Sequence, residues 1–128
     1  MIVDSSAIMA VVFKEPEGPA FSGIITASEA SMSVVGLVES SVVALGRKGE
    51  AGLQVLNELI AEFEITLVEV TPEQGQLAIE AFRRYGRGRH PARLNMGDCF
   101  AYALARSRGE ALLFKGDDFS RTDVKVAA

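Results

Sequence analysis

Acidic side chains stand beside apolar segments in four distant parts of the chain: Asp4, Glu39, Asp98 and the pair Asp117–Asp118. Carboxylates that meet in one cleft repel each other, so such a cluster is stable in its ionised form only around a cation. The chain has no cluster of His or Cys, so the ligands are oxygens, which indicates Mg²⁺ or Mn²⁺ and not Zn²⁺. Such an ion activates a bound water and neutralises charge on phosphate oxygens, which suits phosphodiester hydrolysis.

The most basic stretch of the chain comes shortly before Asp98. Residues 83–93 hold five of the 13 Lys and Arg together with the only His, and they contain no acid. Two glycines and a proline predict a loop over residues 86–93, and we expect this loop to contact the phosphates of a nucleic acid. The side chains expected to make these contacts are Arg87, Arg89, His90 and Arg93. A solvated loop and a surface that binds a protein partner are the alternatives.

Strands and helices must position these side chains, and the apolar pattern predicts that the two alternate along the chain. The predicted strands cover 2–3, 31–33, 65–70 and 111–114, with a short edge strand at 124–126. The predicted helices cover 5–13, 17–27, 34–48, 51–63, 71–85 and 95–105. This alternation predicts one α/β domain over residues 1–128, with a mostly parallel sheet and helices on both of its faces.

Each acid has a defined place in this scheme. Asp4 and the Asp117–Asp118 pair follow strands, and right-handed crossovers bring the carboxyl ends of parallel strands to one edge. Asp98 lies in the first turn of a helix capped by Asn95, where the helix dipole favours a carboxylate. Glu39 lies within an apolar helical run, from which it can reach the same edge.

The predicted helices carry apolar faces. In the helix predicted over 34–48 this face is formed by Val35, Val38, Val42 and Leu45. The helices predicted over 5–13, 17–27 and 51–63 carry more apolar side chains than one small sheet can cover, which predicts self-association. Those side chains are Ile8, Val11, Val12, Phe13, Phe21, Ile24, Ile25, Leu53 and Leu56.

The composition fits one globular domain. The chain has 128 residues, of which 48% are hydrophobic and 23% charged, and its net charge of −4 gives no general sign of nucleic-acid binding. Its single Cys excludes an intramolecular disulfide, so we expect a cytoplasmic protein. No apolar run reaches the roughly 18 residues of a membrane span, and the first residues lack the pattern of a signal peptide.

The sequence resembles one known family along its whole length. The features that carry the resemblance are Asp4-Ser5-Ser6-Ala7, the lone Glu39, the long block from Tyr85 to Ala105, and the segment from Leu113 to Phe119. Together they are similar to PIN-domain ribonucleases of the VapC toxin type, from type II toxin–antitoxin systems. The resemblance implies Mg²⁺- or Mn²⁺-dependent cleavage of RNA such as tRNA or rRNA. It also implies a homodimer, a higher toxin–antitoxin complex and inhibition by a small VapB-type antitoxin.

The resemblance also assigns roles to single residues. The catalytic, metal-binding acids of the family map onto Asp4, Glu39 and Asp98. The fourth acid maps onto Asp117 or Asp118, and the spacing from the preceding strand favours Asp117. The family often has a Ser or Thr two residues after the first Asp, where it helps to hold the metal shell, and Ser6 matches that position.

Three other protein classes deserve comparison. A phosphoacceptor signalling domain also clusters Asp residues in an α/β fold, but it has paired acids after the first strand, whereas Asp4 stands alone. Lys115, just after the last core strand, is the feature that such a domain would share. A phosphatase of the haloacid-dehalogenase type needs a second Asp at the position of Ser6. A binding module that keeps the fold without catalysis would not need the full set of acids.

Overall fold

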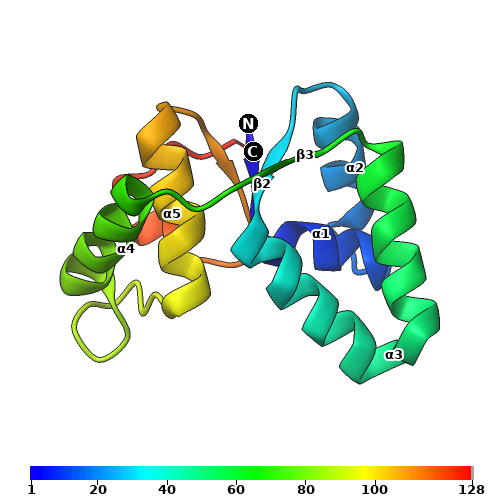
Figure 1. The fold of residues 1–128 in the computed structure, drawn as a ribbon, viewed down its shortest axis with the longest axis horizontal. Coiled ribbons are helices and arrows are strands. Elements are labelled where there is room, and N and C mark those ends of the chain that lie inside the picture. Colours follow the sequence, from blue (N-terminus) through cyan, green and yellow to red (C-terminus); the bar gives the residue numbers. More distant parts are fainter. Residues whose placement is uncertain (128) are drawn as a thin grey trace.

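The computed structural model describes residues 1–127 and shows a four-stranded sheet in the order β3-β2-β1-β4, with all neighbours parallel (Figure 1). The strands are β1 (Ile2–Val3), β2 (Ser31–Ser33), β3 (Thr66–Val68) and β4 (Leu112–Leu113). The helices are α1 (Ser5–Val12), α2 (Gly18–Thr26), α3 (Val34–Glu62), α4 (Pro72–Tyr85) and α5 (Met96–Arg108), followed by the 3₁₀ turn η1 (Phe119–Arg121). This architecture confirms the predicted α/β fold with a parallel sheet.

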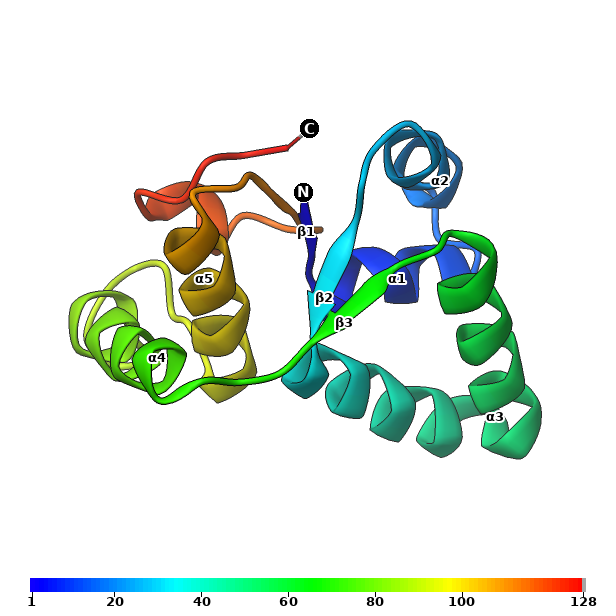
Figure 2. The same cartoon turned by 45° about the horizontal axis from the view of Figure 1, so that its top comes forward.

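Helices cover both faces of the sheet: α1, α2 and α3 lie on one side, and α4 and α5 on the other (Figures 1 and 2). Two apolar cores result, and neighbouring strand residues point into opposite cores, as the two-residue period of a strand requires. Ile2 and Leu112 belong to the core beneath α4 and α5, whereas Val3 and Leu113 belong to the other. The strands β1, β2 and β4 are therefore buried on both faces, which is typical of parallel sheets, whereas the edge strand β3 is largely exposed.

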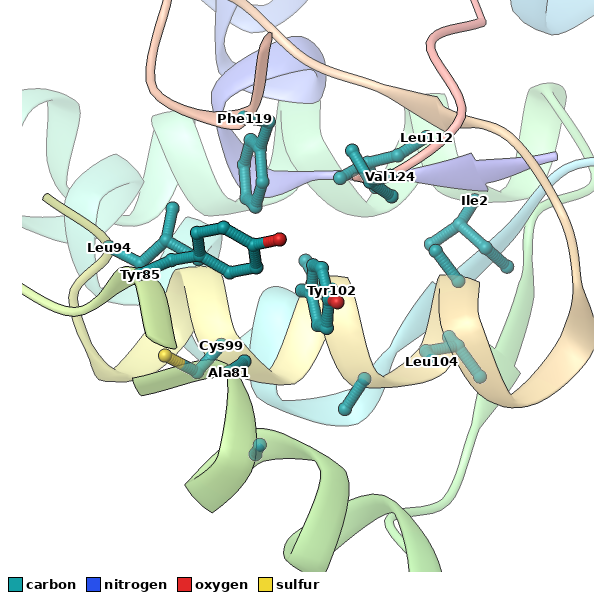
Figure 3. Close-up of a cluster of buried hydrophobic side chains, with 14 of the residues drawn as sticks. Ile2, Ala81, Tyr85, Leu94, Cys99, Tyr102, Leu104, Leu112, Phe119 and Val124 are labelled. Atoms are coloured by element: carbon teal, nitrogen blue, oxygen red, sulfur yellow. The ribbon is translucent and has the colours of Figure 1, made fainter. Parts of the chain in front are cut away.

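Figure 3 shows the core on the α4–α5 side, where aromatic side chains fill the space beside β1 and β4. The rings of Tyr85 and Tyr102 lie 5.8 Å apart between centroids. The hydroxyl of Tyr102 donates to Oδ1 of Asp123 at 2.5 Å, and Asp123 also forms an ion pair with Arg106 at 3.1 Å. This core holds α5 against the sheet and so fixes the place of the helix start that carries Asp98.

The structure departs from the sequence pattern in α3. The sequence predicts two helices here, over 34–48 and 51–63, and the backbone is indeed interrupted between them, at Gly49, whose φ is 63°. The two helices nevertheless follow each other directly and form the single element α3. The apolar face predicted for the first half is largely on the outside: Val38 is 55% and Val42 63% exposed. The buried positions are the small residues Ser40 and Ala44, which allow the helix to approach its neighbours closely.

Two predicted strands are shorter than expected, and the early helices are more deeply buried than expected. The predicted strand over 65–70 narrows to β3, and in the described part of the tail Val126 forms one isolated bridge to Leu112. The prediction that the sheet cannot cover the early helices is wrong, because Ile8, Ile25 and Leu56 are fully buried. These helices cover one another as well as the sheet. Among residues 1–127, no helix has the length and apolar character needed to cross a membrane.

Candidate active site

Asp4 occupies the point where β1 ends and α1 begins. It is only 3% exposed and caps α1, because its Oδ2 accepts from the backbone N of Ser6 at 3.0 Å and from the Ser6 hydroxyl at 2.6 Å. The same hydroxyl oxygen accepts from the backbone N of Lys115 at 3.0 Å, just after β4. Ser6 therefore ties the carboxyl ends of β1 and β4 together around this acid. Burial raises the pKa of Asp4 above its usual value.

Glu39 reaches the same region from α3. Its Oε1 accepts from the hydroxyl of Ser5 at 3.3 Å, which ties the side chain to the first residue of α1. Burial, and then the negative charges of Asp4 and Asp98, raise the pKa of Glu39 to about 7. These charge effects indicate that carboxylates carried by three separate elements lie near enough to act on one another.

Asp98 is held in the first turn of α5 by a reciprocal capping box with Asn95. Asp98 Oδ2 accepts from the Asn95 backbone N at 3.0 Å, and Asn95 Oδ1 accepts from the Asp98 backbone N at 2.8 Å. Burial is the main cause that raises the pKa of Asp98 to about 6, with further contributions from the charges of Asp4 and Asp118. The sequence-based prediction of an Asn95 cap matches this geometry.

The last predicted acid lies in the turn after β4, where Asp117 and Asp118 are both exposed. Asp117 contributes its backbone carbonyl to a hydrogen bond with the Ser120 hydroxyl at 2.6 Å. Asp118 is the member of the pair whose charge contributes to the raised pKa of Asp98. The charge of Asp118 thus acts on Asp98, whereas spacing along the sequence favoured Asp117 as the fourth acid.

The donor chemistry of this cluster fits a hard divalent cation. Within residues 1–127, the Lys and Arg ion pairs all involve other acids, so no protein cation neutralises Asp4, Glu39 or Asp98. Oxygen donors and uncompensated negative charge are what Mg²⁺ and Mn²⁺ require. In the same residues, however, no three His, Cys, Asp or Glu side chains lie close enough to hold a metal ion.

Lys115 is engaged away from these acids. Its Nζ donates to Glu15 at 3.1 Å and forms an ion pair with Glu17 at 3.4 Å. The lysine that would give the chain its likeness to a phosphoacceptor domain is thus directed toward the loop after α1.

The basic loop, residues 86–93, leads from α4 toward α5. Arg87, Arg89 and Arg93 are exposed and form none of the ion pairs within residues 1–127. His90 is half-buried: its Nδ1 accepts from the backbone N of Ala92 at 3.0 Å, and its ring meets the edge of Tyr85 at 5.1 Å. The three arginines are therefore available to a ligand, whereas His90 also holds the loop in shape.

Two residues of the site escaped sequence reasoning. Ser5 holds Glu39, and Gly97 lies against the Glu39 carboxylate so closely that a Cβ at Gly97 would overlap it. Ser5 appeared in the sequence only as a member of the motif Asp4-Ser5-Ser6-Ala7, without a role of its own. Gly97 gave no signal except its place directly before Asp98, because a contact between two helices leaves no local pattern.

Comparisons of the sequence and of the fold with known proteins all indicate the same family. A family model described as "PIN domain" matches residues 1–125. Ribonuclease VapC30 of Mycobacterium tuberculosis is 40% identical over 129 residues, covering 100% of this chain and 98% of that protein. Ribonuclease VapC of Mycolicibacterium smegmatis is 41% identical over 125 residues and 97% of each chain. The crystal structure of Mycobacterium tuberculosis VapC20, a sarcin–ricin loop cleaving toxin, has a TM-score of 0.78 over 96% of this chain and 95% of that one; at 17% identity it shows a shared fold.

Proposed function

The chain belongs to the PIN-domain family, among the VapC ribonucleases, and on that premise we propose that it hydrolyses RNA phosphodiester bonds as the toxin of a type II toxin–antitoxin pair. The observation that supports the proposal is that the charges of Asp4 and Asp98 act on Glu39, although the three acids come from separate elements, while none of the Lys and Arg ion pairs within residues 1–127 involves them. A single site with this charge and these donors is suited to a metal-assisted hydrolase.

In this proposal Asp4, Glu39, Asp98 and Asp118 hold Mg²⁺ or Mn²⁺, and Ser6 orients Asp4. The bound ion would supply an activated water and neutralise charge on the phosphate. The chain itself supplies the rigid placement of the acids: Ser6 fixes one oxygen of Asp4, and the Asn95 cap fixes one oxygen of Asp98. Asp118 is preferred to Asp117 as the fourth acid because its charge acts on Asp98.

The distribution of charge supports RNA as the substrate. Ten of the 13 Lys and Arg lie from Arg83 onward, whereas 12 of the 17 acids precede it, although the net charge is −4. The α4–α5 side therefore carries most of the positive charge and joins the acid cluster at the start of α5. The exposed arginines of the basic loop hold phosphates, and the neighbouring acids then receive the scissile bond.

Partners follow from the apolar surface that remains outside. Val38 and Val42 on α3, and Met96 at the start of α5, are all more than half exposed. A hollow of about 510 Å³ beside Met96 is lined by apolar side chains of α4 and α5. We assign these exposed apolar side chains to contacts with a second copy of the chain, in place of the early helices as the basis for self-association. A VapB-type antitoxin inhibits the enzyme by placing a basic side chain among the acids.

The decisive experiment uses purified chain freed of antitoxin. It should cleave structured RNA with Mg²⁺ or Mn²⁺, stop when EDTA is added, and recover when Mn²⁺ is restored. The Asp4→Asn variant should bind RNA and fail to cleave it, which separates the enzyme from a contaminating nuclease. Cleavage that continues in EDTA, or that is equally fast with Zn²⁺ alone, would contradict the proposed site.

A further inference from the structure

We infer that Gly97 is a positioning residue whose missing side chain gives the Glu39 carboxylate its place beside Asp98. This inference rests on the proposed function, because it concerns the same acids. Its basis is a contact between two helices that are far apart in sequence. A Cβ built on Gly97 would meet three atoms first, and all three, Oε2, Cδ and Oε1, belong to the Glu39 carboxylate.

The contact distinguishes Gly97 from other helical glycines. At Gly23, Gly46 and Gly75 an added Cβ would meet nothing within 4 Å. Gly97 is the second residue of α5, where backbone N–H groups are not used within the helix and the dipole is positive. The bare backbone at this position thus lets a carboxylate from α3 lie against the favourable end of α5.

The obstacle in a Gly97→Ala variant would be the far end of a flexible side chain and not fixed backbone. Glu39 can therefore swing aside, leaving its hydrogen bond to Ser5, while the helices keep their positions. Alanine also favours a helix more than glycine does. The variant should keep or gain thermal stability and lose the placement of one acid, a combination that a purely structural glycine would not produce.

The test compares wild type, Gly97→Ala, Glu39→Ala and the double variant, with Gly23→Ala as the matched glycine control. Mn²⁺ affinity is measured by electron paramagnetic resonance, and melting temperature in EDTA. We expect Gly97→Ala to bind Mn²⁺ about tenfold or more weakly, as when a group that orients a metal ligand is lost. Its melting temperature should not fall. In the Glu39→Ala background, Gly97→Ala should cause no further loss of Mn²⁺ affinity, and Gly23→Ala should match wild type.

Several results would overturn the inference. Wild-type Mn²⁺ affinity in Gly97→Ala would show that Glu39 does not depend on this glycine. An equal loss in both backgrounds, with a lowered melting temperature, would show a general packing role. If Gly97→Ala does not fold, recovery of folding in the double variant supports the overlap with Glu39, and failure of both refutes it. If wild type binds no Mn²⁺, the proposed function fails. The contact between Gly97 and Glu39 is still tested in EDTA, by whether Gly97→Ala changes the melting temperature by a different amount in wild type and in the Glu39→Ala background.

Discussion

Replacing Asp98 by Asn should stabilise the metal-free protein at neutral pH. The pKa of Asp98 is about 6 in the fold, against 3.8 for the ordinary side chain. The unfolded chain therefore loses this proton at lower pH than the folded chain, and stability falls as the pH rises from about 4 to about 6. Each pH unit in that window is worth about 1.4 kcal/mol, so the charge of Asp98 costs the fold roughly 3 kcal/mol before screening.

Two effects reduce this figure. Asp98 is partly exposed, and solvent screening lowers the cost of its charge to about 1–2 kcal/mol. The carboxylate also gains about 0.3–1 kcal/mol from the helix dipole, which Asn loses. Asn keeps an amide oxygen that can accept from the backbone N of Asn95, so the cap itself remains. The net gain expected for Asp98→Asn is about 1 kcal/mol above pH 6, and none below pH 4.

Urea unfolding in EDTA from pH 4 to pH 8 measures this difference directly. Glu50→Gln, at an exposed position of α3, is the matched control and should shift stability by less than about 0.5 kcal/mol. Mn²⁺ should reverse the order, because a ligand at 100 times its Kd stabilises wild type by about 2.7 kcal/mol. A variant that is less stable than wild type at every pH would refute the reasoning, since it would show that the carboxylate acts mainly as a helix cap.

Replacing the three exposed arginines of the basic loop by alanine should weaken RNA binding at low salt and flatten its salt dependence by about 0.7 per lost phosphate contact. Metal affinity should not change, and an unaltered salt slope would favour a protein-docking or solvated loop. Asp118→Asn should impair Mn²⁺ binding and cleavage more than Asp117→Asn does. The opposite order would show that Asp117 is the fourth acid, as its spacing from the preceding strand predicted. Because protonation of Glu39 near pH 7 competes with metal, Mn²⁺ affinity should fall as the pH drops from 8 to 6, and an isothermal titration series checks this. Val38→Lys combined with Val42→Lys should yield a monomer in light scattering, whereas a wild-type monomer at micromolar concentration would exclude the dimer.

The sequence predicted where Asp4 and Asp98 lie in the fold because each of these two acids stands at a local landmark. Asp4 follows an apolar strand and caps the next helix, and Asp98 is paired with Asn95 three residues before it. Such signals lie within a few residues, where strand ends and capping preferences decide the structure. The parallel topology then explains how Asp4 and Asp98, which are 94 residues apart in the sequence, come to lie at the same edge of the sheet.

Contacts between elements could not be predicted in the same way. Periodicity marked an apolar face on α3, but which face turns inward depends on how closely the helix approaches its neighbours. Ser40 and Ala44 permit that approach, so they are buried and Val42 is left outside. The choice between Asp117 and Asp118 depends on the path of a turn, where an error of one residue changes the direction of the side chain.

The separation of charge between the two sides of the sheet explains how an acidic protein can hold an acidic polymer. Alone, the cluster at Asp4, Glu39 and Asp98 would repel a phosphate. Burial is the main cause of the raised pKa values of Glu39 and Asp98, and the charges of neighbouring acids of the cluster raise them further. In the proposed function the arginines of the basic loop would supply local attraction, whereas a divalent ion would reverse the sign of the field at the acids themselves. RNA binding and metal binding should therefore reinforce each other: without metal, the loop alone holds the RNA, and with metal the scissile phosphate can approach the acids. Mn²⁺ should accordingly tighten RNA binding in wild type, measured with a non-cleavable RNA, and much less in Asp98→Asn.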